Sequence, residues 1–264
     1  MRENTRVEMS AEPQIGQEPV CMKTIGVLGG MSSQATSEYY RMLNAGINSV
    51  RGGWSAAELL IFSVNFANIE AFVRSEQWDA AAKYLVEKAI QVERGGADFI
   101  IMVSNTMHKV APQIENAIHI PLIHIVDVAA EEITKQELTT VGVLGTKPVM
   151  EADFYQDRFY QHGIKAISPN GRQRQIIDEI IFNELVLGIH KEESRKVYVD
   201  IMRELAEQGV QGIVLGCTEI EMLVKPEDVP ELPLFNTAAL HCQKAVNLAL
   251  GTTPLPMPRI YTNP

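Results

Sequence analysis

Two residues of this sequence stand where proton-transfer chemistry would need them, each directly after an apolar run. Ser104 follows the run 98–103, and Cys217 follows the run 212–216. A thiol can take up and return a proton once its pKa falls from about 8.5, and a helix that begins just after Cys217 would lower that pKa. A serine hydroxyl is a weaker acid, so Ser104 needs a neighbouring base or a water.

Acting together, the two groups would suit inversion at a carbon atom. One group removes a proton from one face of the carbon, and the other returns a proton from the opposite face. Each position also has a purely structural interpretation. Cys217 could be a small buried apolar residue, and the hydroxyl of Ser104 could cap a helix or hold a ligand. The polar residues that follow Cys217 favour a functional role for the thiol.

A glycine-rich turn, 29–33, follows the first apolar run and precedes a helical pattern that starts near Gln34. Such a turn either presents backbone N–H groups to an anion or serves only as a turn. It lacks the GxGxxG spacing and the lysine of a nucleotide site.

Histidines at metal-ligand spacing are absent from the sequence, and we expect His119 and His124 to have packing or surface roles. His108, four residues after Ser104, either touches the site or lies in solvent.

The elements that must position these residues repeat along the chain. The segment 26–30 resembles 142–146, 96–104 resembles 209–217, and 121–124 resembles 233–236, at offsets of 116, 113 and 112 residues. Each half alternates short apolar runs with longer helical patterns, including 76–94, 172–188 and 193–208, which is typical of buried parallel strands in βαβ units. We therefore predict an α/β protein of two similar domains related by pseudo-twofold symmetry, with the active site between them. In such sheets ligands bind beyond the carboxyl ends of the strands.

The domain boundaries follow from this pattern. We expect a disordered leader at 1–21, a first α/β domain at 22–125, a second at 126–236, and a C-terminal helix and tail at 237–264 that packs back on the first domain.

The net charge of −10 argues against nucleic acid and anionic membrane as partners. Three unpaired cysteines favour a reducing compartment, and we infer the cytoplasm. We expect a small amino acid or dicarboxylate as ligand and a homodimer as assembly.

Four segments resemble the aspartate/glutamate racemase family in order: MKTIGVLGGMSSQAT, SNTMHKVAP, VGVLGTKPVME followed by DFY, and GCTEIEMLV. They span nearly all of 22–251. The resemblance implies a two-domain α/β enzyme that inverts amino acids without pyridoxal phosphate or metal, using one thiol from each half. It further implies that Cys217 is a catalytic acid/base. The positions expected to bind substrate are Met31, Asn105, Thr106, Thr146, Thr218 and Glu219.

Three features depart from the family pattern. Ser104 stands where the family has its first cysteine, and the sequence looks most similar to an enterobacterial branch in which threonine occupies this place. The glycine loop ends in Ser-Ser, so the pocket wall is altered. The arginine and lysine that bind the side-chain carboxylate in some members have no clear equivalent, although Arg74, Arg172 and Arg174 are candidates.

The sequence therefore predicts a cofactor-independent aspartate or glutamate racemase, with Cys217 and Ser104 acting on opposite faces of Cα. Two alternatives stay open. One is a decarboxylase similar to arylmalonate decarboxylase, in which one thiol protonates a carbanion left by loss of carbon dioxide. The other is a dicarboxylate-binding protein that has lost catalysis together with its first cysteine.

Overall fold

The computed structural model describes residues 21–259, and its first half forms a parallel sheet of four strands. The strand order is β2-β1-β3-β4. The strands are β1 (Ile25–Gly29), β2 (Leu59–Ser63), β3 (Phe99–Met102) and β4 (Leu122–Ile123). The two central strands pair in register from Ile25 with Phe99 to Leu28 with Met102. They therefore end at the same edge of the sheet, and Ser104 lies just beyond that edge.

The second half repeats this sheet with the order β6-β5-β7-β8. The strands are β5 (Thr140–Gly145), β6 (Lys165–Ile167), β7 (Ile213–Gly216) and β8 (Leu234–Asn236). Each strand of the second sheet occupies the place of its counterpart four strands earlier. The predicted α/β fold with two similar parallel sheets is therefore confirmed, and the three matched segment pairs fall on equivalent strands.

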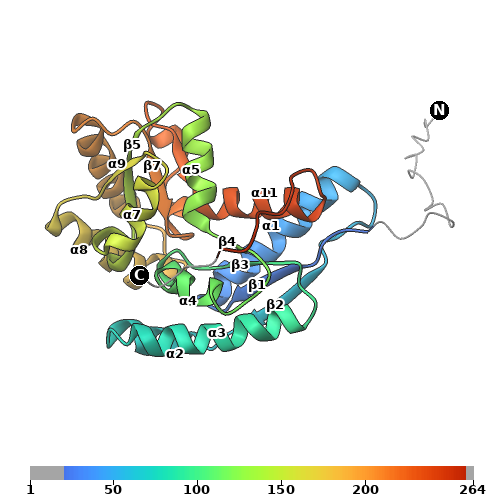
Figure 1. The fold of residues 1–264 in the computed structure, drawn as a ribbon. Coiled ribbons are helices and arrows are strands. Elements are labelled where there is room, and N and C mark those ends of the chain that lie inside the picture. Colours follow the sequence, from blue (N-terminus) through green and yellow to red (C-terminus); the bar gives the residue numbers. More distant parts are fainter. Residues whose placement is uncertain (1–20, 260–264) are drawn as a thin grey trace, which may run out of the picture.

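Helices cover both faces of each sheet (Figure 1). The first half contains α1 (Ser33–Arg51), α2 (Phe66–Arg74), α3 (Trp78–Arg94), the 3-10 turn η1 (Thr106–Val110) and α4 (Ala111–Glu115). The second contains α5 (Ile125–Lys135), α6 (Lys147–Glu151), α7 (Asp153–Tyr160), α8 (Gly171–Asn183), η2 (Leu185–Leu187), α9 (Glu192–Glu207), α10 (Ile220–Leu223), η3 (Pro226–Asp228) and α11 (Thr237–Ala249).

The cores follow from the alternation of side chains along a strand. In β1, Ile25 and Val27 pack with α1 and α11 on one face, whereas Leu28 packs with α3 on the other. In β5, Val141 packs with α5 and α7, whereas Leu144 packs with α8 and α9. Because both faces are buried, these strands are apolar throughout, as the apolar runs of the sequence predicted.

Two predicted helices differ from the observed ones at their ends. The helix predicted from 76 begins at Trp78, because Glu76 adopts a positive φ of 54° and separates α2 from α3. The helix predicted to 188 ends at Asn183, and a 3-10 turn then leads to Gly188 in the left-handed region. Helix α2 itself was not predicted, since its nine residues are too few to establish a clear periodicity.

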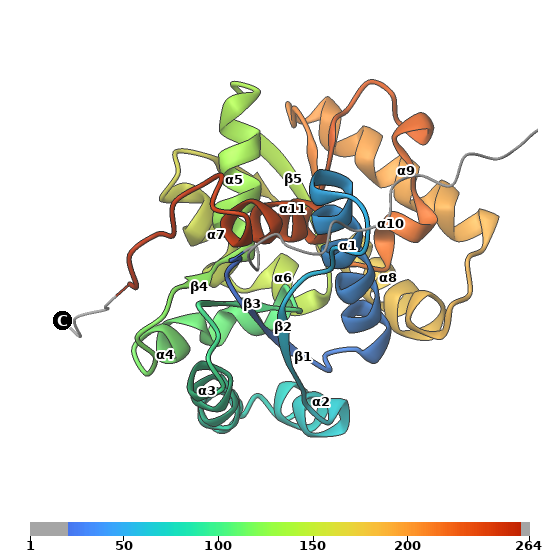
Figure 2. The ribbon, with the colours of Figure 1, turned by 90° about the vertical axis from the view of Figure 1, so that its right-hand side faces the viewer.

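The C-terminal helix α11 lies between α1 and α5, as both views show (Figure 2). Cys242 of α11 is buried in the cluster that also holds Tyr39 and Leu43 of α1. Apart from Cys21, the expected leader lies outside the described residues, as does the end of the tail. Within 21–259, the structure has no helix that is both long enough and apolar enough to span a membrane.

Candidate active site

A pocket of about 890 Å³ lies between the two halves and is lined by residues from both. Ser104 and Cys217, at the equivalent ends of β3 and β7, both line it. The structure also brings all the expected substrate-binding positions to this pocket: Met31, Asn105, Thr106, Thr146, Thr218 and Glu219. The duplicated topology therefore gathers side chains that are more than a hundred residues apart in sequence.

The glycine turn after β1 shapes one wall of the pocket. Gly30 has a φ of +90°, and a Cβ atom there would lie 2.2 Å from the carbonyl oxygen of Val64, so only glycine fits. Its N–H donates to Thr36 Oγ1 at 2.8 Å, while Ser32 Oγ accepts the N–H of Ala35 and caps α1. This N–H is therefore already bonded within the protein.

The strand end of the first half carries a weakly activated hydroxyl. Ser104 Oγ accepts the backbone N–H of Met107 at 3.2 Å, which orders the start of η1. The Ser104 carbonyl oxygen lies 2.7 Å from His108 Nδ1. Among residues 21–259, neither a carboxylate nor an imidazole hydrogen-bonds to the Ser104 hydroxyl. Within the described residues the hydroxyl therefore has no base hydrogen-bonded to it.

The strand end of the second half carries a thiol beside a carboxylate. The half-buried Cys217 Sγ donates to Glu219 Oε2 at 3.0 Å. The same carboxylate accepts from Thr218 Oγ1 at 2.7 Å and from Ser32 Oγ at 3.4 Å. Burial and the charge of Glu219 raise the pKa of the Cys217 thiol well above its ordinary value.

The expected lowering of the Cys217 pKa by a following helix is therefore wrong. Helix α10 begins only at Ile220 and has four residues, so its dipole is small. The carboxylate of Glu219 accepts a hydrogen bond from the sulfur at 3.0 Å and stabilises the protonated thiol. The thiol consequently carries its proton in the substrate-free protein and holds it against a carboxylate that can accept it.

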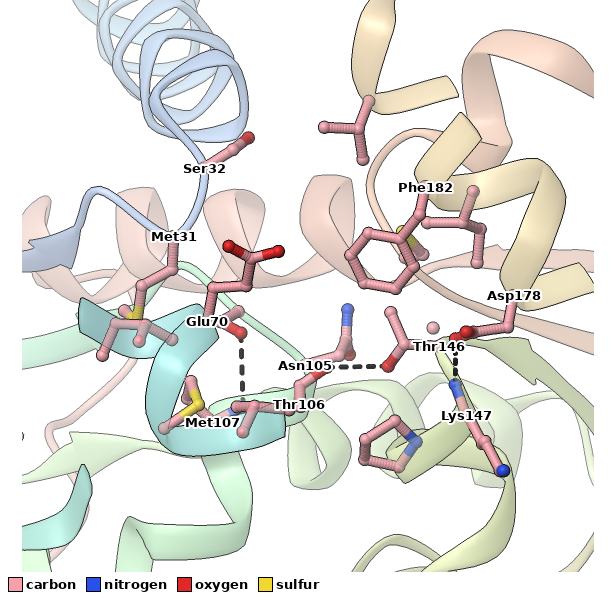
Figure 3. Close-up of a pocket in the computed structure, with 18 of the residues that line it drawn as sticks. Met31, Ser32, Glu70, Asn105, Thr106, Met107, Thr146, Lys147, Asp178 and Phe182 are labelled. Carbon is pink, nitrogen blue, oxygen red and sulfur yellow. Dashed lines mark hydrogen bonds between the residues drawn. The ribbon is translucent and has the colours of Figure 1, made fainter. Parts of the chain in front are cut away.

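Polar side chains join the two halves across the pocket. Thr106 Oγ1 and Thr146 Oγ1, one from each half, lie 2.8 Å apart (Figure 3). Asn105 is buried, accepts from the hydroxyl of Tyr155 at 2.9 Å and donates to Thr237 Oγ1 at 3.1 Å. Tyr155 was not predicted as a site residue. It lies in the segment DFY on which the family resemblance partly rested, which was the available signal.

The histidines near the site form a buried structural cluster. His108 is 1% exposed and its Nε2 accepts the N–H of Ile125, so it neither lies in solvent nor reaches the Ser104 hydroxyl. Its ring lies 4.5 Å from that of His124 and 6.1 Å from that of His241. Burial lowers the pKa of His108 to about 3 and that of His241 to about 4, so both are neutral at pH 7. His119, by contrast, is exposed.

Charged and apolar residues that the sequence did not single out also line the pocket. Glu70 from α2 and Phe182 from α8 reach into it from opposite sides, and Asp178 lies beside Thr146 and Lys147 (Figure 3). These side chains fit the polar and apolar faces of ordinary amphipathic helices, so nothing in the sequence marked them as part of a site.

The arginine candidates differ in position. Arg74 lines the pocket and pairs with Glu70 at 2.6 Å. Arg172 and Arg174 do not line it, and Arg174 pairs with Glu151 at 3.1 Å. Within the described part of the chain, no group of three or more His, Cys, Asp or Glu side chains is arranged to hold a metal ion.

The paired sheets define a two-domain α/β protein with a polar pocket between its halves. The model of the Asp/Glu/hydantoin racemase family matches residues 28–245, and the chain belongs to this family. It is 42% identical to a protein from Yersinia pestis solved as a candidate Asp/Glu racemase, with a TM-score of 0.82 over 87% of this chain and 100% of that one.

Two other relatives extend the comparison. An aspartate racemase homologue from Pyrococcus horikoshii is 34% identical, with a TM-score of 0.75 over 86% of this chain and 99% of that chain. A broad specificity amino-acid racemase, RacX of Bacillus subtilis, is 24% identical over 241 residues, which cover 86% of this chain and 98% of RacX.

Proposed function

We propose that this protein is an amino-acid racemase that inverts Cα by proton transfer between the substrate and the two strand ends. The family and the broad specificity relative support racemase activity. The observation that carries the proposal is that Ser104 and Cys217, at equivalent ends of two matching sheets, line one pocket. Aspartate and glutamate, named in the family and in the relatives, are the first substrates to examine.

On the Cys217 face, Glu219 gives the thiol a way to act in both directions. When the thiol donates its proton to a substrate carbanion, a thiolate remains. When it must act as a base, its proton first passes to Glu219, 3.0 Å away, and the thiolate then takes the Cα proton. The transfer within the pair leaves its net charge unchanged, which suits a partly buried site.

On the Ser104 face, proton transfer depends on water. A serine hydroxyl without a neighbouring base cannot hold a proton taken from carbon, so it relays the proton to and from pocket water. Ser104 therefore positions water for proton transfer on its face, and Cys217 acts as the main acid and base. The carbanion gains enediolate character, and hydroxyl and amide donors around the α-carboxylate stabilise that charge. The Asn105 amide, with its second N–H, and the one hydroxyl proton left over in the Thr106–Thr146 pair are suited to this role because a carboxylate only accepts hydrogen bonds. Thr218 joins them when its hydroxyl turns away from Glu219.

Proton exchange measured by NMR in deuterated water tests this proposal. Purified protein is incubated with each enantiomer of aspartate and glutamate, and then with a panel of other amino acids, with reductant present. Loss of the Cα–H signal and chiral chromatography should both report turnover. Absence of exchange and inversion for every amino acid at high protein concentration would overturn the proposal.

A single thiol in the pocket also suits the decarboxylase alternative. Among residues 21–259, Cys217 is the one cysteine that lines the pocket, and one thiol is enough to protonate a carbanion left by decarboxylation. Carbon dioxide release from a disubstituted malonate, without Cα exchange of any amino acid, would identify that activity instead. Tight dicarboxylate binding with neither reaction would indicate a binding protein.

A further inference from the structure

The charges that line the pocket bear on the side chain of the substrate. Six carboxylates line it: Glu70, Glu76, Glu151, Asp178, Glu179 and Glu219. The basic residues that line it are Arg74, Lys109 and Lys147. A substrate with a second carboxylate would enter a site where acidic groups already outnumber basic ones, and like charges at close range repel.

Each of these three basic groups already has a partner. Arg74 pairs with Glu70 at 2.6 Å, and Lys147 Nζ lies 3.9 Å from Glu151. Lys109 Nζ lies 4.0 Å from the centre of the Trp78 ring, a cation–π distance. Arg74 is therefore engaged by a close ion pair, whereas Lys147 and Lys109 make only a long ion-pair contact and an aromatic contact.

Asp178, by contrast, has one carboxylate oxygen that accepts no hydrogen bond from the described residues. It is half-buried on α8, and its Oδ1 accepts the backbone N–H of Lys147 at 2.7 Å. Among the residues that the structure describes, no side chain hydrogen-bonds to it and Oδ2 has no hydrogen-bond partner. Burial raises the pKa of Asp178, and the positive charge of Lys147 opposes that rise. Figure 3 shows its carboxylate beside Thr146, one of the expected substrate contacts. Its charge also contributes to the raised pKa of the Cys217 thiol, so Asp178 acts electrostatically on the reacting centre.

We propose that the pocket selects an amino acid whose side chain ends in an ammonium or guanidinium group, and that Asp178 accepts hydrogen bonds from that group. This inference rests on the proposed function and narrows its substrate class, away from the aspartate or glutamate that the sequence resemblance predicts. A pocket of about 890 Å³ leaves room for such a long side chain. A buried or half-buried carboxylate with an open oxygen gains most from a cationic donor.

The first test compares side chains in the wild-type protein. Rates of Cα exchange in deuterated water are measured for lysine, arginine and ornithine and for glutamate and aspartate. We expect kcat/KM to be higher for the basic amino acids by about tenfold or more, the effect of one charge-assisted hydrogen bond. Faster exchange of glutamate or aspartate than of every basic amino acid would overturn the inference while leaving the racemase proposal intact.

The second test changes Asp178. Asp178→Asn keeps an acceptor for the N–H of Lys147, so α6 stays anchored, but it removes the charge. We expect kcat/KM for lysine to fall about 10- to 100-fold and kcat/KM for glutamate to stay or rise. The matched control is Asp200→Asn, the same chemical change on the exposed face of α9. An unchanged ratio of lysine to glutamate in Asp178→Asn would contradict the inference.

If no amino acid is turned over, binding measurements can still test the selection of a basic side chain separately from racemase activity. Calorimetry of wild-type protein with lysine and with glutamate measures selection without catalysis. Tighter lysine binding that is lost in Asp178→Asn supports the inference even if racemase activity fails. Tighter glutamate binding, or binding of neither amino acid, overturns it.

Discussion

The ends of β3 and β7 occupy the same place in two sheets of the same strand order, yet their chemistry differs. After β3, the Ser104 hydroxyl accepts a backbone N–H and has no acid or base beside it within the described residues. After β7, the Cys217 thiol donates to a carboxylate 3.0 Å away. The matching strand orders thus bring both groups to one pocket, whereas a carboxylate that could accept a proton lies beside only one of them.

The surroundings of the two ends reinforce this difference. The first end is followed by η1 and by buried neutral histidines, which bond to backbone groups and leave the pocket without a titrating partner for Ser104. The second is followed by Glu219, whose carboxylate is shared by three side-chain donors. The two faces of a bound substrate would therefore meet one acid/base pair and one relay.

Removing the thiol should have the largest effect. In Cys217→Ala, we expect racemisation to fall by about 10²- to 10⁴-fold, the usual contribution of a positioned acid or base. Chiral chromatography of the products measures it. The matched control is Cys21→Ser, an exposed cysteine outside the pocket, which should leave the rate unchanged. Full activity in Cys217→Ala would show that the second strand end is not the stronger partner.

Removing the carboxylate next to the thiol should have the next largest effect. In Glu219→Gln, we expect kcat to fall by about 10- to 100-fold, because the thiol loses its proton acceptor. At the same time the pKa of Cys217 should fall, since the charge of Glu219 helps to raise it. The rate of thiol alkylation as a function of pH measures this shift. A lower activity with an unchanged alkylation profile would mean that Glu219 acts on the substrate rather than on the thiol.

The difference between the two strand ends can be measured by comparing the rate of deuterium exchange at Cα with the rate of inversion. Two enantiomers have equal free energy, so kcat/KM for inversion must be equal in both directions. The difference should therefore appear in the ratio of exchange to inversion for each enantiomer. The enantiomer whose Cα–H faces Cys217 should take up deuterium from solvent faster than it inverts, whereas its mirror image should not. In Ser104→Cys, inversion should speed up by about tenfold to a hundredfold, and the excess of exchange over inversion should shrink. Equal ratios for both enantiomers in the wild type would contradict the asymmetric picture.

The sequence was sufficient for the fold and for the residues at the two strand ends, because both depend on local signals. Parallel strands buried on both faces are continuous apolar runs, and the repeat fixed their equivalence. The environment of each group was not predictable. The raised pKa of Cys217 depends on where the Glu219 side chain points, and the role of Asp178 depends on the packing of α8 against α6. Contacts of this kind arise from tertiary structure and leave no periodic pattern.

The smallest effect on catalysis, with a clear effect on stability, is expected from the buried histidines beneath the Ser104 end. Burial lowers the pKa of His108 from its ordinary 6.5 to about 3 and that of His241 to about 4. Between those values and 6.5 the unfolded chain binds more protons than the folded one, so stability is complete above pH 6.5 and is lost as the pH falls through this window. Within this window, each such imidazole lowers the free energy of unfolding by roughly 1.4 kcal/mol for each pH unit.

Urea unfolding at pH 7.5 and at pH values down to about 5 measures this loss. In His108→Gln, which removes one titrating ring, the slope of stability against pH should become shallower although the variant is less stable at pH 7.5. The control is His119→Gln, the same substitution at an exposed ring, and the two slopes are compared directly. Since the ring of His108 bonds to the Ser104 carbonyl rather than to its hydroxyl, the ratio of exchange to inversion should change little in this variant. A large change in that ratio would show that the first strand end does have a titrating partner, and the contrast between the two ends would then be weaker than the hydrogen bonds indicate.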